Sequence, residues 1–196
     1  RGRVLLRRWW QLRWRRRLRS LVKQKRGPMN TLTRWMRHLW LDEANVRHLI
    51  TREGLARLEA RVQASESRHR GELRLCIEGG LPAQALWSGT TSRERAIELF
   101  SELRVWDTEH NNGVLIYLQL ADHRIEVLAD RGLMQQVPDA VWQDMTDALG
   151  QHLQAGHFEA GLTQAIDQVG ALLHVHYPLV AGQTNIDELP NAVVLL

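Results

Sequence analysis

The chain has 196 residues, of which 44% are hydrophobic and 24% charged, and this is enough for one well-buried core of an ordinary globular type. No apolar run approaches the roughly 20 residues that span a bilayer, and the single cysteine, Cys76, excludes an intramolecular disulfide. Because residues 1–28 contain 12 Lys or Arg and no acid, the remainder has 14 basic and 22 acidic residues, a net charge of −8, and nucleic-acid binding is not expected of the folded part.

Residues 1–28 form a basic tail rich in Arg, Trp and Leu. Arg beside Trp suits contact with an anionic membrane or another polyanion. The alternative, which we favour, is that this tail is not native, because Met29 follows it directly and would serve as the true start. No apolar segment or cleavage site of a secretory signal follows the basic residues, so we expect a cytoplasmic protein, with peripheral contact to a membrane left open.

Residues 29–47 predict an amphipathic helical lead-in to the folded domain. Its polar positions include Arg34, Arg37 and His38. The apolar residues that recur at helical spacing are Leu32, Trp35, Met36, Leu39 and Trp40. Such a stripe can touch a membrane surface or a partner, but most stripes of this kind face a core, so we expect it to pack against the domain.

Residues 48–178 are predicted to form the α/β domain, which begins with a helix capped by Thr51. Alternating apolar residues over 72–77 predict a half-buried strand. Residues 79–91 contain Gly-Gly, Pro and Ser-Gly-Thr-Thr and are expected to be a loop. A helix over residues 92–106, capped by Ser92, follows, and its inward face is predicted to consist of Ala96, Leu99, Phe100, Leu103 and Trp106.

Residues 113–129 predict an apolar β-hairpin. Its first strand, over 114–120, is almost continuously apolar, as expected of a central strand covered on both faces. A tight turn at 121–123 leads to the return strand at 124–129. Together with the preceding strand and helix, the hairpin predicts a three-layer αβα sandwich with a small mixed sheet, made of a βαβ unit plus the antiparallel hairpin strand, and with helices on both faces.

Two helices are predicted after the hairpin. Pro138 starts the first and Gly156 ends it. Its inward residues are predicted to be Val141, Trp142, Met145 and Leu149. The face of the second is marked by Phe158, Leu162, Ala165, Ile166, Val169, Leu172 and Leu173. Residues 179–196 are expected to be a poorly ordered C-terminal tail.

The order of these elements places three polar segments at one edge of the sheet. They are the approach to the first strand, the loop over residues 107–112 and the end of the return strand. Carboxylate and amide oxygens there are the ligands that Ca²⁺ or Mg²⁺ prefers. The predicted cation ligands are Asp107, Glu109, Asn112 and Asp130, and the substrate- or anion-binding candidates are Arg131 and Asn111. The alternative is that these are turn and cap residues, with Arg131 paired to Asp107 or Glu109.

Five further polar residues are secondary candidates, namely Glu66, His69, Glu72, Asp122 and Arg124. The first three resemble metal ligands in spacing, but a solvated helix end explains such residues more often. The last two flank the hairpin turn at the opposite edge, where they are expected to stabilise the turn.

No catalytic motif is present, since the chain has no GxSxG, P-loop or GxGxxG sequence. Cys76 lies mid-strand between apolar neighbours and is expected to be a buried, inert thiol. The catalytic residues of any enzyme activity therefore stay unknown, and no organic cofactor is expected.

Residues 103–132, LRVWDTEHNNGVLIYLQLADHRIEVLADRG, resemble the core of the TPM domain family. That family is named for a thylakoid lumen protein, a photosystem II repair factor and a worm acetylcholine-receptor modulator. The shared features are Asn-Gly before an apolar strand, a short polar turn with Asp and Arg, and a return strand ending near Gly. Residues 65–78 resemble a compact bacterial subgroup without signal peptide, and 158–162 resemble the segment before the family's last helix, so that the resemblance covers about residues 48–178.

The resemblance implies an α/β sandwich whose members are described as binding Ca²⁺ in an acidic cleft, as acid phosphatases, or as accessory factors for membrane complexes. This chain has Asn111-Asn112-Gly113 where the family usually has Asp-Asn-Gly, so one expected carboxylate is missing, and Asp130 is its candidate replacement. We therefore expect a non-catalytic interaction domain, stabilised by Ca²⁺ or Mg²⁺, that assists an unknown protein partner in a membrane or envelope complex. The alternative is a metal-dependent phosphomonoesterase in which Arg131 neutralises phosphate charge.

Overall fold

The computed structural model describes residues 31–41, 43–180 and 188–196. The predicted basic tail at 1–28 lies outside the described residues. The described helices are α2 (Thr31–Trp40), α3 (Glu43–Leu49), α4 (Arg52–Glu66), α5 (Ala83–Trp87), α6 (Ser92–Glu102), α7 (Arg131–Met134), α8 (Asp139–Ala155) and α9 (Phe158–His176). The strands are β1 (Leu73–Glu78), β2 (Val114–Gln119), β3 (Arg124–Ala129) and β4 (Val194–Leu195). None of the described helices is both long and apolar enough to cross a membrane.

The four strands form one mixed sheet in the order β3-β2-β1-β4. Strands β1 and β2 are parallel, with Leu73 opposite Val114, and β3 returns antiparallel to β2. The predicted βαβ unit and hairpin are therefore confirmed. Every residue of β2 is buried, as its continuous apolar sequence predicted for a central strand.

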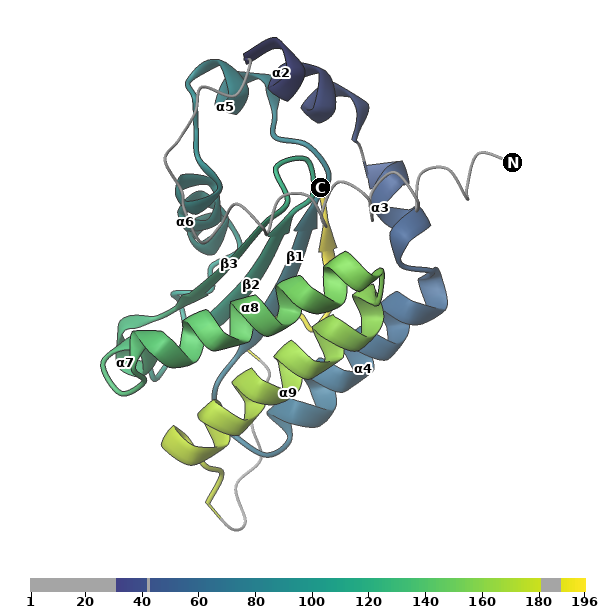
Figure 1. Cartoon of the computed structure of the whole chain (residues 1–196). Coiled ribbons are helices and arrows are strands. Elements are labelled where there is room, and N and C mark those ends of the chain that lie inside the picture. The colour runs from purple at the N-terminus through teal and green to yellow at the C-terminus, as the bar shows by residue number, and fades with distance from the viewer. Residues whose placement is uncertain (1–30, 42, 181–187) are drawn as a thin grey trace.

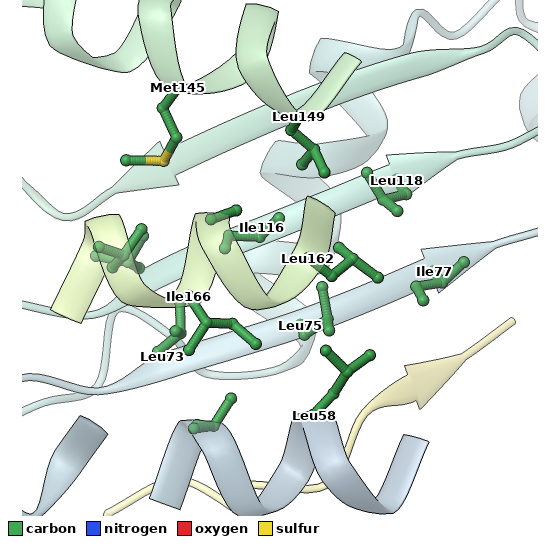
Figure 2. Close-up of a cluster of buried hydrophobic side chains, with 14 of the residues drawn as sticks. Leu58, Leu73, Leu75, Ile77, Ile116, Leu118, Met145, Leu149, Leu162 and Ile166 are labelled. Carbon is green, nitrogen blue, oxygen red and sulfur yellow. The ribbon is translucent and has the colours of Figure 1, made fainter. Parts of the chain in front are cut away.

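Helices cover the sheet on both faces, which confirms the predicted three-layer arrangement (Figure 1). Helices α4, α8 and α9 lie together on one face, and α6 packs against β2 and β3 on the other. The larger core lies between the sheet and the three helices (Figure 2). Its labelled residues are Leu58, Leu73, Leu75, Ile77, Ile116, Leu118, Met145, Leu149, Leu162 and Ile166. A smaller core around Leu99 and Tyr117 joins α6 to the sheet.

The helix ends follow local cap chemistry. The hydroxyl of Thr51 accepts a hydrogen bond from the Gly54 amide, so this predicted cap is confirmed. The N-cap of α6 is Thr91 and not Ser92, because Thr91 and Glu94 form a reciprocal capping box. Gly156 ends α8 in the left-handed region at φ 81°, as predicted.

Three predictions about local structure are wrong. The loop expected over 79–91 contains the short helix α5. Val141 and Trp106, both predicted to face inward, are exposed, since Val141 lies in the first turn of α8 and Trp106 follows the end of α6. The C-terminal tail contributes β4, which pairs in parallel with β1 at the edge of the sheet. A two-residue strand carries too little local pattern to be recognised in a sequence.

Helix α2 is docked in the opposite sense to the one we expected. Its polar residues face the domain, and Met36, Leu39 and Trp40 are exposed. The Arg34 side chain bonds to Asp122 and to the Thr90 carbonyl, both at 3.0 Å. The amphipathic pattern therefore predicted a helix correctly but assigned its buried face wrongly.

Candidate functional site

The three predicted polar segments lie side by side at the sheet edge where β1 and β2 begin and β3 ends. The Asn112 side-chain amide donates to the Arg70 carbonyl at 3.0 Å, which ties the loop to the approach of β1. The Asp130 amide donates to the Gly113 carbonyl at 2.8 Å, and the Gly132 amide donates to the Asn111 carbonyl at 3.1 Å. These backbone bonds hold the loop and the end of β3 together.

The loop before β2 has a conformation that its sequence explains. Asn111 has φ 51°, and asparagine tolerates this left-handed region better than most residues. The Thr108 hydroxyl accepts a hydrogen bond from the Asn112 amide at 3.1 Å. At Gly113, an added Cβ would lie 1.9 Å from the Val105 carbonyl oxygen, so only glycine fits. Backbone geometry thus explains the asparagine at position 111 and requires the glycine at position 113.

Asn112 and Asp130 each present a buried oxygen that lacks a hydrogen-bond partner among the described residues. The Asn112 side chain is completely buried, and its Oδ1 accepts no hydrogen bond. Asp130 is the N-cap of α7, and its Oδ1 accepts from the Arg131 amide at 2.7 Å, while its Oδ2 is buried without a partner. Buried polar atoms are normally satisfied by protein or by ordered water, so these two oxygens are free to accept a hydrogen bond from water or to bind a cation.

The remaining predicted ligands at this edge are exposed. Asp107 and Glu109 both face solvent, and the Glu109 amide donates to the carboxylate of Glu188 at 3.0 Å. Arg131 is also exposed and, within the described ranges, forms no ion pair with either acid. No three His, Cys, Asp or Glu side chains of the described residues gather to hold a metal ion. A cation here would therefore need amide, backbone and water oxygens besides carboxylate.

Glu66, His69 and Glu72 do not belong to a solvated helix end, contrary to our expectation, because all three are buried. Glu66 Oε1 accepts from the Leu73 amide at 2.9 Å, and Glu72 Oε2 accepts from the Leu189 amide at 3.2 Å. Glu66 thus satisfies a backbone amide at the start of β1, and Glu72 satisfies one in the distant C-terminal segment.

His69 uses both ring nitrogens inside the protein. Its Nδ1 lies 3.0 Å from the Gly71 carbonyl oxygen and must donate, so Nε2 accepts from the Ser65 hydroxyl at 3.0 Å. Burial lowers the pKa of His69 to about 4, so the ring is neutral at pH 7. A metal could bind it only by breaking one of these bonds.

Four residues at the edge were missed by the sequence analysis, namely Arg70, His110, Tyr177 and Glu188. Arg70 Nη1 lies 3.3 Å from His110 Nε2, and its amide donates to the Tyr177 carbonyl at 2.9 Å. The hydroxyl of Tyr177 lies close to Gly132, where an added Cβ would be 2.6 Å from it. Tyr177 and Glu188 reach the edge only through the fold, so no local pattern could have indicated them.

The opposite edge, where β1 and β2 end, holds a buried polar network. Glu78 accepts hydrogen bonds from the Tyr117 hydroxyl and from Arg95 Nε at 3.1 Å. Burial raises the pKa of Glu78 despite these partners. Burial also raises the pKa of Cys76 to about 12, which agrees with the predicted inert thiol.

Asp122 anchors α2 at this edge and does not merely stabilise the hairpin turn, while Arg124, its predicted companion, is exposed at the start of β3. The Asp122 carboxylate lies 3.0 Å from Arg34 Nε, 3.7 Å from Arg37 Nη2 and 3.3 Å from His38 Nε2. Burial alone would raise the pKa of Asp122, but the contacts with His38 and Arg34 outweigh it and hold the pKa well below its usual value.

Docking of α2 should therefore depend on pH. Because the pKa of Asp122 is lower in the folded protein, its stabilising contribution is complete above its ordinary pKa of about 3.9 and is lost as the pH falls below about 4. Asp122→Asn should remove it at every pH. We expect hydrogen exchange of the α2 amides, corrected for intrinsic rates, to be about tenfold faster in this variant at pH 7.

Asp144→Asn, which changes an exposed carboxylate on α8, is the matched control and should exchange like the wild type. Equal α2 protection in wild type and Asp122→Asn at pH 7 would contradict the anchoring role.

Comparisons with known proteins agree with this architecture. The model of the TPM domain matches residues 44–172. The NMR structure of the BA42 protein from the psychrophilic bacterium Bizionia argentinensis is similar with a TM-score of 0.66 and 26% sequence identity, and the match covers 75% of this chain and 95% of that chain. No curated protein gives a significant sequence match.

Proposed function

Because this chain belongs to the TPM domain family, we propose that it is a non-catalytic accessory domain that binds a divalent cation at the edge formed by residues 107–113 and 130–132. The cation would be Ca²⁺ or Mg²⁺, and the domain would assist a protein partner in a membrane or envelope complex. No organic cofactor is part of the proposal.

One observation carries the cation proposal. Asn112 Oδ1 and Asp130 Oδ2 are buried oxygens without hydrogen-bond partners among the described residues, and they belong to segments that are hydrogen-bonded to each other. Hard cations prefer such amide and carboxylate oxygens and complete their shells with carbonyl and water oxygens. Asp107 and Glu109 add exposed carboxylates to the same loop. A bound cation would compensate for the desolvation that the two buried oxygens now bear.

A thermal-shift screen with CaCl₂ and MgCl₂ tests the proposal. A cation at 100 times its dissociation constant adds about 2.7 kcal/mol to the free energy of unfolding, because it binds the folded state alone. For a chain of this size the melting temperature should rise by about 5–10 °C. Asp130→Asn should abolish most of the rise, since asparagine keeps the helix cap but removes the charge.

Asp144→Asn again serves as the matched control and should keep the full shift. If neither cation moves the melting temperature of the wild type, or if Asp130→Asn responds as the wild type does, the cation site is wrong.

A metal-dependent phosphomonoesterase is the second candidate, and the positive charge at the edge favours it. Arg70 and His110 are in contact there, and Arg131 is exposed beside Asp130, so a phosphate could be held next to the cation. Turnover of an aryl phosphate should then be lost in both Asp107→Ala and Asp130→Ala. Activity that survives both substitutions would come from a contaminating phosphatase.

A further inference from the structure

We propose that the edge of β1 that faces away from β2 is a binding site for an extended segment of a partner protein, and that residues 188–196 of this chain fill it until the partner binds. We call these residues the C-terminal segment. The site is a partner surface for the accessory role proposed above. None of the side chains that bind the segment is a proposed cation ligand, so either proposal can fail alone.

The C-terminal segment is bound through its backbone. Strand β4 lies beside β1 and pairs with it in parallel (Figure 1). The Leu196 amide donates to the Ile77 carbonyl at 3.1 Å, and the Leu196 carbonyl accepts from the Gly79 amide at 2.8 Å. Before β4, the Val193 amide donates to Glu59 Oε1 at 3.1 Å. Addition of a strand to a sheet edge is a recurring way of binding extended peptides, in which backbone hydrogen bonds supply the affinity.

Two buried charged side chains of β1 also bind the backbone of the segment. Glu72 Oε2 accepts from the Leu189 amide at 3.2 Å, and Arg74 Nη1 donates to the Ala192 carbonyl at 3.3 Å. Glu72 is 0% exposed and Arg74 is 6% exposed, and their spacing of two residues places them on one face of the strand. Removing the segment would take these partners from two buried charged groups, which is costly. Replacement by another extended segment is therefore favoured over an empty site.

One side chain of the segment gives the site its selectivity. Leu189 is 6% exposed and belongs to the smaller core with Leu99 and Leu115, and it is the only buried residue among 188–196. Pro190 and Ala192 are exposed. The chemistry of the occupant follows from this pattern. A partner segment must be extended, must offer free backbone groups, and must carry leucine or a similar apolar residue where Leu189 lies.

The segment and a partner would compete for the same edge of β1. Because the segment is part of the chain, it acts at an effective concentration of about millimolar, so the intact protein binds a second segment weakly. A substitution that weakens the chain's own segment should therefore strengthen binding of an added peptide. A merely structural strand would show no such gain.

Fluorescence anisotropy with a fluorescein-labelled peptide of residues 188–196 tests the proposal on the full chain. The peptide should bind the Leu189→Ala protein at least tenfold more tightly than the wild type, because the competing segment has lost its buried side chain. A peptide that carries Pro190→Ala and Ala192→Ser should bind this protein equally well. A peptide that carries Leu189→Ala should bind it at least tenfold more weakly.

A second variant and a receptor substitution keep the test independent of folding. Val193→Pro in the full chain removes the N–H that Glu59 accepts but leaves Leu189 in the core, and it should also bind the peptide more tightly than the wild type does. Adding Glu59→Ala to the Leu189→Ala protein should weaken peptide binding by about tenfold, because an acceptor of the peptide backbone is lost. Adding Asp144→Ala, the matched control, should leave binding unchanged.

Equal binding of the peptide to the wild type and to both segment variants, or no binding to either variant, would overturn the proposal. So would a wild-type dimer in gel filtration that the peptide converts to a monomer, since the segment of a second copy would then be the occupant.

Discussion

Gly113→Ala is expected to lower the free energy of unfolding by about 3 kcal/mol or more. The new Cβ would lie 1.9 Å from the Val105 carbonyl oxygen and 3.0 Å from its carbonyl carbon, and backbone atoms cannot rotate away as a side chain can. The Gly113 carbonyl also accepts from Asp130, so relief of the clash would separate the two strands at the candidate site. Urea unfolding followed by circular dichroism measures the loss, which corresponds to about 6–12 °C in melting temperature.

Gly89→Ala is the control that distinguishes the steric clash at Gly113 from the cost of placing alanine in a left-handed backbone conformation. Gly89 has φ 75°, but nothing lies within 4 Å of an added Cβ, so alanine there meets only the unfavourable left-handed conformation. The expected cost is about 1 kcal/mol. If Gly113→Ala costs no more than Gly89→Ala, the close approach to Val105 is not what requires glycine before β2.

The elements that the sequence predicted correctly are those whose signal is local. The continuous apolar run of β2 and the Thr51 cap each lie within a few residues, and each has the predicted structure. The alternation in β1 correctly predicted a strand, but the expectation that this strand is half-buried is wrong, because all six of its residues are buried. The parallel and antiparallel pairing followed from element order alone, because a helix between two strands of one sheet requires a parallel crossover.

Several of the wrong predictions involve partners that lie outside the local sequence. Glu66 and Glu72 resembled solvated residues, but each accepts a hydrogen bond from a backbone amide, and for Glu72 that amide belongs to Leu189. The burial of α2 by its polar side depends on Asp122, which is 88 residues from Arg34. A charged residue looks the same in a sequence whether water or a distant ion pair will satisfy it.

The candidate site, too, was predicted only where the signal is local or follows from the order of the elements. Topology correctly brought the loop before β2 and the end of β3 to one edge, and the sequence marked Asn112 and Asp130 there as oxygen donors. Which donors are buried and lack hydrogen bonds depends on side-chain packing, so the exposed Asp107 and the buried Asn112 could not be distinguished beforehand. Arg70 was missed because its role depends on contacts with the loop, 40 residues away at His110.

Glu78→Ala is expected to lower the free energy of unfolding by about 3–5 kcal/mol. The carboxylate is 1% exposed and bridges the Tyr117 hydroxyl to Arg95 Nε. Its removal leaves the phenol and a largely buried guanidinium without their acceptor, and an uncompensated buried charge is costly. Arg95 keeps Glu98 at 3.1 Å, which limits the loss. Burial raises the pKa of Glu78 in the folded state, so the folded protein binds a proton at Glu78 more readily than the unfolded chain does. The difference in stability between wild type and variant should therefore grow as the pH falls toward the ordinary glutamate pKa of 4.5.

A double-mutant cycle isolates the Tyr117–Glu78 bond from the loss of packing. Tyr117→Phe keeps the ring in the small core and removes only the hydroxyl, so it should cost about 1.5–3 kcal/mol, the range for hydrogen bonds to charged groups. Combined with Glu78→Ala, its further cost should fall below about 1 kcal/mol, because the acceptor is already absent. Additive losses in urea unfolding would show that the two side chains stabilise the sheet independently. Losses that are not additive would show that the Tyr117–Glu78 bond links β1 to β2. This link lies toward the edge of the sheet that carries Asp122 and α2.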